Sequence, residues 1–163
     1  RCWSMPTKNT FNIPQIKNII EKYNHGFSID PFANINKMAS VTNDLNPEYG
    51  ADYAEDALVF LKRFEDNSVD VVLYDPPFSV RQVSECYKKM NMSVNYKTTS
   101  ARYWSAQKAE IGRIVKLGGN VITCGWNSGG VGKKHGFEIV EILLVAHGGW
   151  HNDTIVTVET KIK

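Results

Sequence analysis

Residues 69–79 read V-D-V-V-L-Y-D-P-P-F-S. The stretch from Val69 to Tyr74 is mostly apolar and β-branched and is too short for a helix, which indicates a buried strand. The strand ends at an acid, two prolines and an aromatic residue. Pro76 and Pro77 have fixed φ angles and no backbone N–H, so the carbonyl groups there are presented on a stiff scaffold. We therefore expect a rigid polar tip at the end of this strand.

The tip combines hydrogen-bond acceptors with an aromatic face. Asp75 supplies a carboxylate, and Phe78 supplies a flat apolar surface. An acceptor-rich corner beside a stacking surface suits a planar ring that carries an exocyclic amino group, and a flipped adenine is one such ring. A plain turn at the end of a strand could carry the same four residues. The rest of the chain has to decide between these two interpretations.

Length and composition indicate one globular domain, residues 1–163, of which 42% are hydrophobic and 22% are charged. The formal net charge of +2 permits a nucleic-acid partner without requiring one. Cys2, Cys86 and Cys124 form no Cys-x-x-Cys pair, which is typical of free thiols in a reducing compartment. No apolar run approaches the roughly 18 to 20 residues of a membrane span, so we expect a cytoplasmic protein.

Patterns of strands and helices alternate along the chain. We expect helices at 14–23, in part of 53–64, at 80–89 and at 102–117, and strands at 27–29, 39–42, 69–74, 120–126, 138–146 and 154–162. The first three strands end at or near Asp30, Asp44 and Asp75. This order predicts an α/β fold with a doubly wound, mostly parallel sheet that ends in an antiparallel hairpin. The functional edge would then be the carboxyl ends of the strands.

Residues 54–78 resemble the central block of the S-adenosylmethionine-dependent DNA amino-methyltransferases, the adenine-N6 and cytosine-N4 enzymes. In that family a D-A-L-x-F-L segment leads through D-N-S-V-D to a D-P-P-[YFW] tip, and all three are present here. D-P-F-A at 30–33 is similar to the family's cofactor motif, which normally continues with glycines where Asn34 and Asn36 stand here. Asparagine is the next most tolerant residue of the left-handed conformation that glycine adopts. A non-catalytic relative that keeps the fold therefore stays an alternative.

The resemblance implies a Rossmann-like class I methyltransferase that transfers a methyl group from S-adenosylmethionine to the N6 of adenine in DNA. Cytosine-N4, RNA and protein methylation remain alternatives. The implied catalytic residues are Asp75, Pro76, Pro77 and Phe78. The implied cofactor-binding residues are Phe11, Asp30, Phe32, Ala33, Asp44, Asp56 and Ala57. Alternative roles are core packing for Phe11, a helix or turn cap for Asp44, and a helix N-cap for Asp56.

Candidate substrate contacts come from the loops beyond the tip. They are Ser79, Tyr96, Trp104 and Lys133. Trp104 could instead be a core residue of its helix, and Lys133 could belong to a solvated face, because the surrounding G-G-V-G-K-K lacks the full pattern of a phosphate loop. His147 and His151 flank two glycines in an expected hairpin turn, and with no third ligand evident we expect no metal site. The chain has no room for a separate target-recognition region, so specificity would come from loops, from a partner, or be loose.

Overall fold

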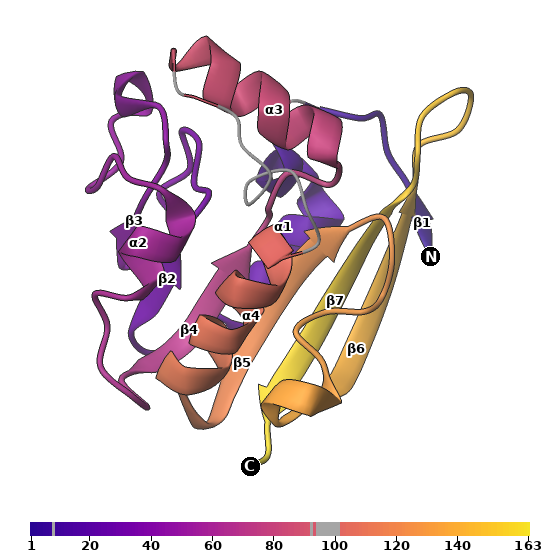
Figure 1. Ribbon diagram of the computed structural model, residues 1–163. Helices are drawn as coiled ribbons and strands as arrows, with labels where there is room; N and C mark the ends of the chain where they lie inside the picture. The colour runs from indigo at the N-terminus through magenta and orange to yellow at the C-terminus, as the bar shows by residue number, and fades with distance from the viewer. Residues whose placement is uncertain (8, 92, 94–101) are drawn as a thin grey trace.

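The computed structural model describes residues 1–7, 9–91, 93 and 102–163. They form a 7-stranded sheet in the order β1-β6-β7-β5-β4-β2-β3 (Figure 1). The strands are β1 (Cys2–Trp3), β2 (Ser28–Asp30), β3 (Val41–Thr42), β4 (Val69–Tyr74), β5 (Val115–Gly125), β6 (Phe137–Ala146) and β7 (Thr154–Lys161). β7 runs antiparallel to β5 and β6, whereas the other neighbouring strands are parallel. The predicted α/β fold, with a mostly parallel sheet and a final antiparallel hairpin, is confirmed.

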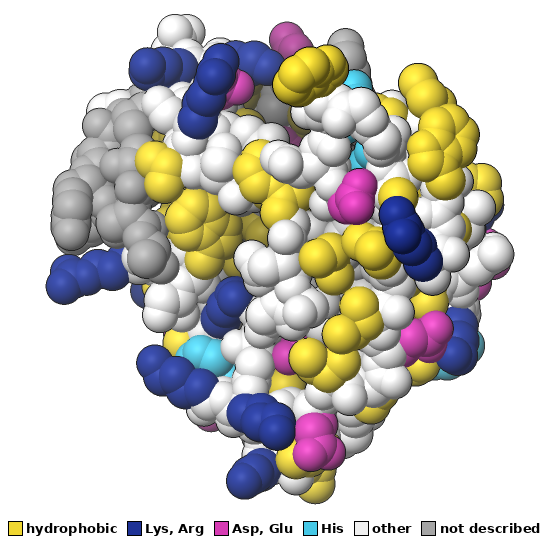
Figure 2. Space-filling model, turned by 90° about the vertical axis from the view of Figure 1, so that its right-hand side faces the viewer, with side chains coloured by type: hydrophobic (Ala, Val, Ile, Leu, Met, Phe, Trp, Pro, Cys, Tyr) yellow, Lys and Arg dark blue, Asp and Glu magenta, His cyan; other side chains and the backbone are white. Residues whose placement is uncertain are grey.

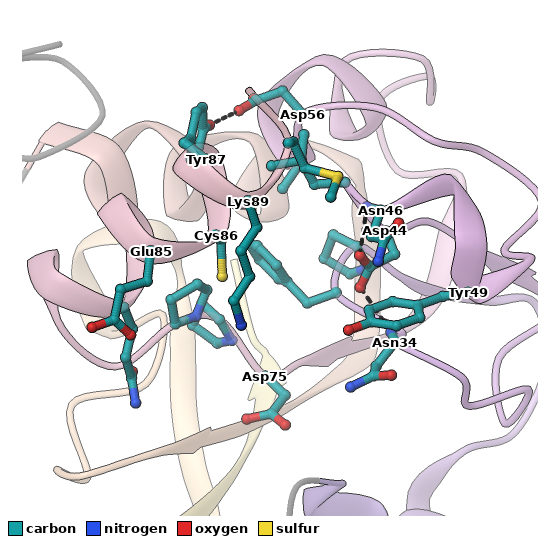
Figure 3. Close-up of a pocket in the computed structure, with 18 of the residues that line it drawn as sticks. Asn34, Asp44, Asn46, Tyr49, Asp56, Asp75, Glu85, Cys86, Tyr87 and Lys89 are labelled. Carbon is teal, nitrogen blue, oxygen red and sulfur yellow. Dashed lines mark hydrogen bonds between the residues drawn. The ribbon is translucent and has the colours of Figure 1, made fainter. Parts of the chain in front are cut away.

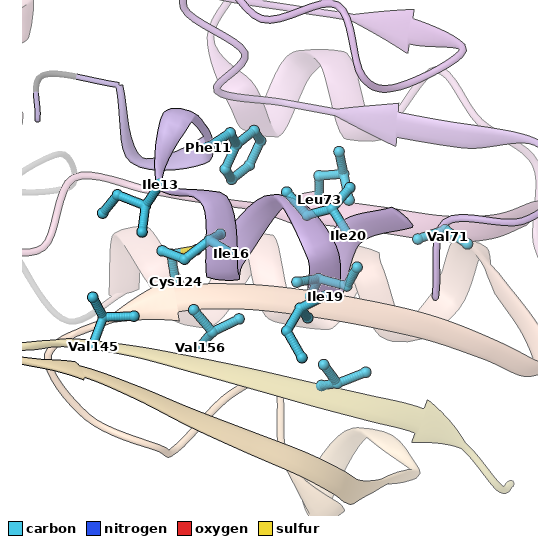
Figure 4. Close-up of a cluster of buried hydrophobic side chains, with 12 residues drawn as sticks. Phe11, Ile13, Ile16, Ile19, Ile20, Val71, Leu73, Cys124, Val145 and Val156 are labelled. Atoms are coloured by element: carbon cyan, nitrogen blue, oxygen red, sulfur yellow. The ribbon is translucent and has the colours of Figure 1, made fainter. Parts of the chain in front are cut away.

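One face of the sheet is covered by α1 (Pro14–Tyr23). Ile16, Ile19 and Ile20 repeat at helical spacing and are buried, so they form the stripe that α1 turns toward the sheet (Figure 4). They pack in one cluster with Val71 and Leu73 of β4. Pro14 occupies the first turn of the helix, where its missing N–H would have no intrahelical partner.

The opposite face is covered by α2 (Ala57–Leu61) and α4 (Arg102–Ile114). Phe60 of α2 and Ile111 of α4 share a buried cluster with Val72 and Tyr74 of β4. Alternate residues of β4 therefore point to the two helical layers, which explains why the strand is apolar from Val71 to Tyr74. A further helix, α3 (Val80–Lys89), lies above the carboxyl ends of the strands (Figure 1).

The helix predicted for 102–117 ends earlier, at Ile114. Val115 already pairs with Val69 of β4, and the regular ladder resumes at Asn120, which pairs with Val71. The residues in between loop out, and Gly118 has a φ of +80° that favours glycine. The helix thus ends before Gly118 and Gly119, the predicted stop, because Val115 already pairs with β4.

One further difference concerns the amino-terminal half. The segment between β2 and β3, residues 31–40, forms turns, and no helix was predicted there. The amino-terminal segment, which carried no strand prediction, contributes β1, whose Cys2 and Trp3 pair with Val145 and Ala146 at the end of β6. This pairing has no local sequence signal, because a strand of two residues shows no period.

The outer edge of the sheet carries apolar side chains. Ile139, Val140 and Ile142 of β6 are about half exposed, and hydrophobic side chains reach the surface in several groups on this side of the molecule (Figure 2). An irregularity in the pairing with β7 between Ile139 and Glu141 bends the strand at this point. Such a bulge disrupts the flat edge that another strand would pair with.

Candidate active site

The carboxyl ends of β2, β3 and β4 surround a cavity of about 470 Å³ (Figure 3). Its walls are the turns after β2 and β3, the start of α2, the tip after β4, and one side of α3. Of the sequence-predicted site residues, the following line it: Phe32, Asp44, Asp56, Ala57, Asp75, Pro76, Pro77 and Phe78. The fold thus brings together residues that are widely separated in the sequence. The cavity volume lies in the range of about 300–1,000 Å³ that is usual for drug-sized ligands.

Asp75 follows the last residue of β4 and borders this cavity. Its Oδ1 atom is buried and has no hydrogen-bond partner among the described residues. Burial raises the pKa of Asp75 to about 6, and a hydrogen bond with the Thr10 side chain offsets part of that rise. A buried acceptor without a partner is costly unless a ligand supplies the donor. The tip therefore holds a buried acceptor at the border of the cavity.

Asp30 ends β2, the strand beside β4, and is fully buried. Its Oδ1 accepts a hydrogen bond of 2.9 Å from the backbone N–H of Phe32, while Oδ2 has no partner among the described residues. The pKa of Asp30 lies well above its usual range, first because of burial and then because of the negative charges of Asp75 and Asp44. Three carboxylates thus repel one another behind one cavity, an arrangement that a cationic ligand would relieve.

Asn34 adopts the backbone conformation that the expected glycine would provide. Its φ is +52°, in the left-handed region. In this conformation its backbone N–H donates a 2.9 Å hydrogen bond to Oδ2 of Asp44. Oδ1 of Asp44 accepts a second bond, of 2.8 Å, from the backbone N–H of Asn46 (Figure 3). Asp44 therefore joins the turns after β2 and β3, and its carboxylate has further acceptor capacity toward the cavity.

Asn36 stabilises the same turn through the amino-terminal segment. Its side-chain amide and that of Asn9 exchange two hydrogen bonds of 2.8 Å. Asn9 also caps the 3-10 helix η1 (Thr10–Asn12) by accepting a bond from the N–H of Phe11. Thr7, Asn9 and Thr10 line the cavity, and our sequence reasoning missed all three. The only local signal is the preference of asparagine for helix caps.

Asp56 is committed to contacts within the protein. Its Oδ1 accepts a 2.9 Å bond from the N–H of Leu58 and so caps α2, which was one of its two expected roles. Its Oδ2 accepts a hydrogen bond from the Tyr87 hydroxyl of α3 (Figure 3). Burial and this hydrogen bond raise the pKa of Tyr87, so the hydroxyl stays a donor. Asp56 borders the cavity and also holds α3 against α2.

Asn43 is a further residue that sequence reasoning missed. It is fully buried after β3, and its side-chain amide donates 3.0 Å bonds to the carbonyls of Pro31 and Glu55. Its Oδ1 accepts a 3.0 Å bond from the Glu55 N–H. One buried amide therefore fixes the distance between two walls of the cavity.

The tip after β4 is held by three neighbours. The indole N–H of Trp104 donates a 3.0 Å hydrogen bond to the Pro77 carbonyl, and Gln82 Oε1 accepts one of 2.6 Å from the Phe78 N–H. The Phe78 ring lies edge-on to Trp126, with 5.6 Å between the ring centroids. Ser79 caps α3 by accepting a 3.2 Å bond from the N–H of Gln82. Trp104 and Ser79, proposed as substrate contacts, thus also position the tip.

Three other predicted residues lie elsewhere. Phe11 is 2% exposed and packs in the core beneath α1, which was its alternative role, and Ala33 is fully buried behind the cavity. Lys133 begins η3 (Lys133–His135), just before the amino-terminal end of β6, and so lies at the sheet edge opposite Asp75 (Figure 1). Tyr96 lies outside the described residues.

Metal ligation and membrane insertion find no support in the residues that the structure describes. Within these residues, no group of three or more His, Cys, Asp or Glu side chains is arranged to hold a metal ion. Both ring nitrogens of His147 lie 2.8 Å from oxygen partners, the Ser4 carbonyl and the Thr154 hydroxyl. In the same part of the chain, no helix has the length and apolar character needed to span a bilayer.

The conformation of Asn34 gives a first prediction. Asn34→Ala should lower the free energy of unfolding by about 1 kcal/mol, because a Cβ-bearing residue without a polar side chain is strained at positive φ. Asn34→Gly should change it by less than about 0.5 kcal/mol, because glycine adopts this conformation without strain. Urea unfolding of both variants measures the difference. An alanine variant as stable as the glycine variant would show that the left-handed conformation is not needed here.

The unpaired carboxylate gives a second prediction, on stability. The pKa of Asp75 is raised to about 6 in the folded state, so the ionisation of its carboxyl group opposes folding above about pH 6. This penalty decreases as the pH falls toward the pKa that Asp75 has in the unfolded chain. Asp75→Asn should therefore raise the free energy of unfolding at pH 7.5 by about 2 kcal/mol, and by much less at pH 4.5.

Asp52→Asn is the matched control for this measurement. Hydrogen bonds from the N–H and hydroxyl of Thr42 lower the pKa of Asp52, so its ionised form favours folding. This variant should lose stability at pH 7.5. Urea unfolding at both pH values tests the pair, and the same sign of change in both variants at pH 7.5 would contradict the electrostatic account.

Several solved structures have the same fold. TrmN from Thermus thermophilus has a TM-score of 0.60 at 15% identity over 91% of this chain, which spans 49% of the TrmN chain. The 1,6-didemethyltoxoflavin-N1-methyltransferase of Burkholderia thailandensis, solved with S-adenosylhomocysteine, has a TM-score of 0.62 at 9% identity over 96% of this chain and 80% of its own. An S-adenosylmethionine-dependent methyltransferase from Methanosarcina mazei has a TM-score of 0.56 at 13% identity over 88% of this chain and 97% of its own. No family model matches the sequence, and no curated protein does. The chain has the Rossmann-like fold of class I methyltransferases.

Proposed function

We propose that the protein transfers a methyl group from S-adenosylmethionine to the exocyclic N6 amino group of adenine in DNA. The observation that carries this proposal is the buried Oδ1 of Asp75, an acceptor without a partner among the described residues, at the wall of the 470 Å³ cavity. The D-P-F-A and D-N-S-V-D segments, through their resemblance to DNA amino-methyltransferases, favour DNA as the substrate. The D-P-P-F motif is shared by the adenine-N6 and cytosine-N4 enzymes of that family, so cytosine N4 is the alternative acceptor that base mapping distinguishes.

The donor site would be the part of the cavity formed by the turns after β2 and β3. When bound, S-adenosylmethionine supplies a methyl group on a positively charged sulfur. The carboxylates of Asp44 and Asp75 give that region a negative potential that suits a cation. The pKa of Asp30 is raised mainly by burial and further by the charges of Asp75 and Asp44. Asp44 would hold the ribose hydroxyls, as acids after the second strand do in dinucleotide folds.

The chemistry required of the protein is modest. The amino nitrogen of adenine is a poor nucleophile because its lone pair is delocalised into the ring. By accepting hydrogen bonds from the two N–H groups, the Asp75 carboxylate and the Pro76 carbonyl would favour a tetrahedral nitrogen with a localised lone pair. The methylated nitrogen becomes positively charged, and Asp75 would accept the proton that it releases. Rigid placement of these acceptors is the main contribution, and the two prolines provide it.

Methyl transfer from labelled cofactor to defined single- and double-stranded DNA, with mapping of the modified base, tests this function directly. Wild-type protein should label adenine, and Asp75→Ala should abolish labelling while leaving cofactor affinity, measured by calorimetry, within about twofold, because Asp75 acts on the acceptor. RNA and protein acceptors serve as controls. Label in protein alone, or an equal loss of binding and transfer in the variant, would sink the proposal.

The raised pKa of Asp75 predicts the pH dependence of this transfer. Since Asp75 titrates at about 6, the transfer rate should rise as the pH increases through this value, because the protonated acid presents a hydroxyl donor and no charge. Asp75→Asn keeps one acceptor oxygen and does not titrate, so it should retain reduced activity without this dependence. Rates of both proteins from pH 5 to 8 decide the matter. An unchanged acidic limb in the asparagine variant would assign the titration to another group.

A further inference from the structure

A second cavity, of about 230 Å³, borders the same D-P-P-F tip. Pro76, Pro77 and Phe78 line both cavities, so the tip is their common wall. The second cavity is bounded by the ends of β4 and β5, by α4 and by the segment after β5. Its volume is below the roughly 300–1,000 Å³ of sites for drug-sized ligands, which suits one flat ring system better than a whole nucleotide.

The wall on β5 carries a polar atom that needs a partner. Thr123 lines the cavity and is only 7% exposed, and its hydroxyl has no hydrogen-bond partner among the described residues. Lys108, on α4, lines the same cavity with its three N–H donors. Burial lowers the pKa of Lys108, as expected for an ammonium group that is partly removed from water. The second cavity is thus rich in donors, whereas the tip beside it is rich in acceptors.

Two indole rings complete the walls. Trp104 is fixed by its 3.0 Å hydrogen bond to the Pro77 carbonyl, and Trp126 lies against Phe78 and is 41% exposed. Aromatic faces of this kind are the usual stacking surfaces for unpaired bases. Trp126 is the face that an incoming ring would meet first, because it is the more exposed of the pair.

We propose that this cavity binds the acceptor as a nitrogen heterocycle with an exocyclic amino group, stacked on Trp126, with Thr123 and Lys108 donating to its ring acceptors. The amino group would extend past Pro76 toward Asp75. This inference rests on the proposed function and adds the residues that select the acceptor. Donors for the ring and acceptors for the amino group distinguish such a heterocycle from a protein amide, which has no ring to fill the cavity.

A third cavity, of about 200 Å³, also touches Phe78 and Trp126. It is lined by the amino-terminal segment and the turn between β6 and β7, but by neither Asp75 nor Pro76. Asp75 lines neither of the two smaller cavities, but Pro76, which is next to it in the chain, lines the second cavity and not the third. The second cavity is therefore the better site for the reacting ring.

The test compares Thr123→Val with Thr157→Val. Thr157 pairs with Thr123 across β5 and β7, and its hydroxyl is equally buried and without a partner among the described residues, but it lines none of the three cavities described above. Each variant therefore removes one hydroxyl from the same face of the sheet. Trp126→Ala is the second probe, since loss of a stacking surface has a larger effect than loss of one hydrogen bond.

Binding is measured without cofactor, by fluorescence anisotropy of labelled single-stranded DNA with one adenine in a thymine tract. Thr123→Val should weaken binding about fivefold and Trp126→Ala about tenfold or more, with Thr157→Val within twofold of wild type. The acceptor KM should rise in parallel, while cofactor affinity stays unchanged. Competition experiments with RNA of the same sequence and with free adenosine show whether the bound ring belongs to DNA, to RNA or to a free nucleoside.

Equal binding by the wild type, Thr123→Val and Trp126→Ala would overturn the assignment of the cavity. An equal effect of Thr157→Val and Thr123→Val would also overturn it, because the loss of any hydroxyl on this face of the sheet would then weaken binding, whether or not it lines the cavity. Failure of the proposed function looks different: the wild type would transfer no methyl group to any acceptor, whatever the variants do to binding. Labelling of a glutamine-containing peptide alone would refute both proposals.

Discussion

The structure depends on the adjacency of two parallel strands whose carboxyl ends carry the acids Asp30 and Asp75. β2 pairs with β4 through Ser28 and Ile29, so Asp30 and Asp75 emerge at the same edge of the sheet. Each has a carboxylate oxygen without a partner among the described residues, and the negative charge of Asp75 contributes to the raised pKa of Asp30. Such groups oppose folding, because burial removes hydration that no protein group replaces. The two apolar layers on either side of the sheet have to offset this cost.

The rigidity of the tip follows from the alternation of side chains along β4 between the two faces of the sheet. Its alternate side chains point to α1 and to α4, so the strand is locked on both faces along its whole length. The polar tip therefore starts from the most constrained point of the sheet. Proline at two successive positions keeps that rigidity beyond the last ladder hydrogen bond. A flexible loop at the same place would have to lose conformational entropy each time a ligand bound.

Much of this arrangement could be predicted from the sequence, because its signals are local. The apolar run of β4, the helical spacing of α1 and the cap and polar face of α3 all lie within a dozen residues, and the helix predicted at 80–89 matches Val80–Lys89. The position of Asp44 and Asp75 at one cavity followed from the parallel order of the strands, whereas Asp56 was assigned to the site through the resemblance to the methyltransferase family. Contacts between distant segments could not be predicted in this way. The amide pair of Asn9 and Asn36 and the placement of Thr10 near Asp75 depend on how the amino-terminal segment folds back.

The same reasoning explains why the substitution of glycine by asparagine in the turn after β2 is compatible with a formed site. Glycine would provide conformational freedom alone, whereas Asn34 adopts the left-handed conformation and also accepts a 2.8 Å bond from the N–H of Ile35. Asn36 adds a side-chain hydrogen bond to Asn9, which a glycine could not make. The turn is therefore held by side-chain amides from two segments. Its geometry is set before any ligand arrives, and the amino-terminal segment becomes part of the site rather than a lead-in to it.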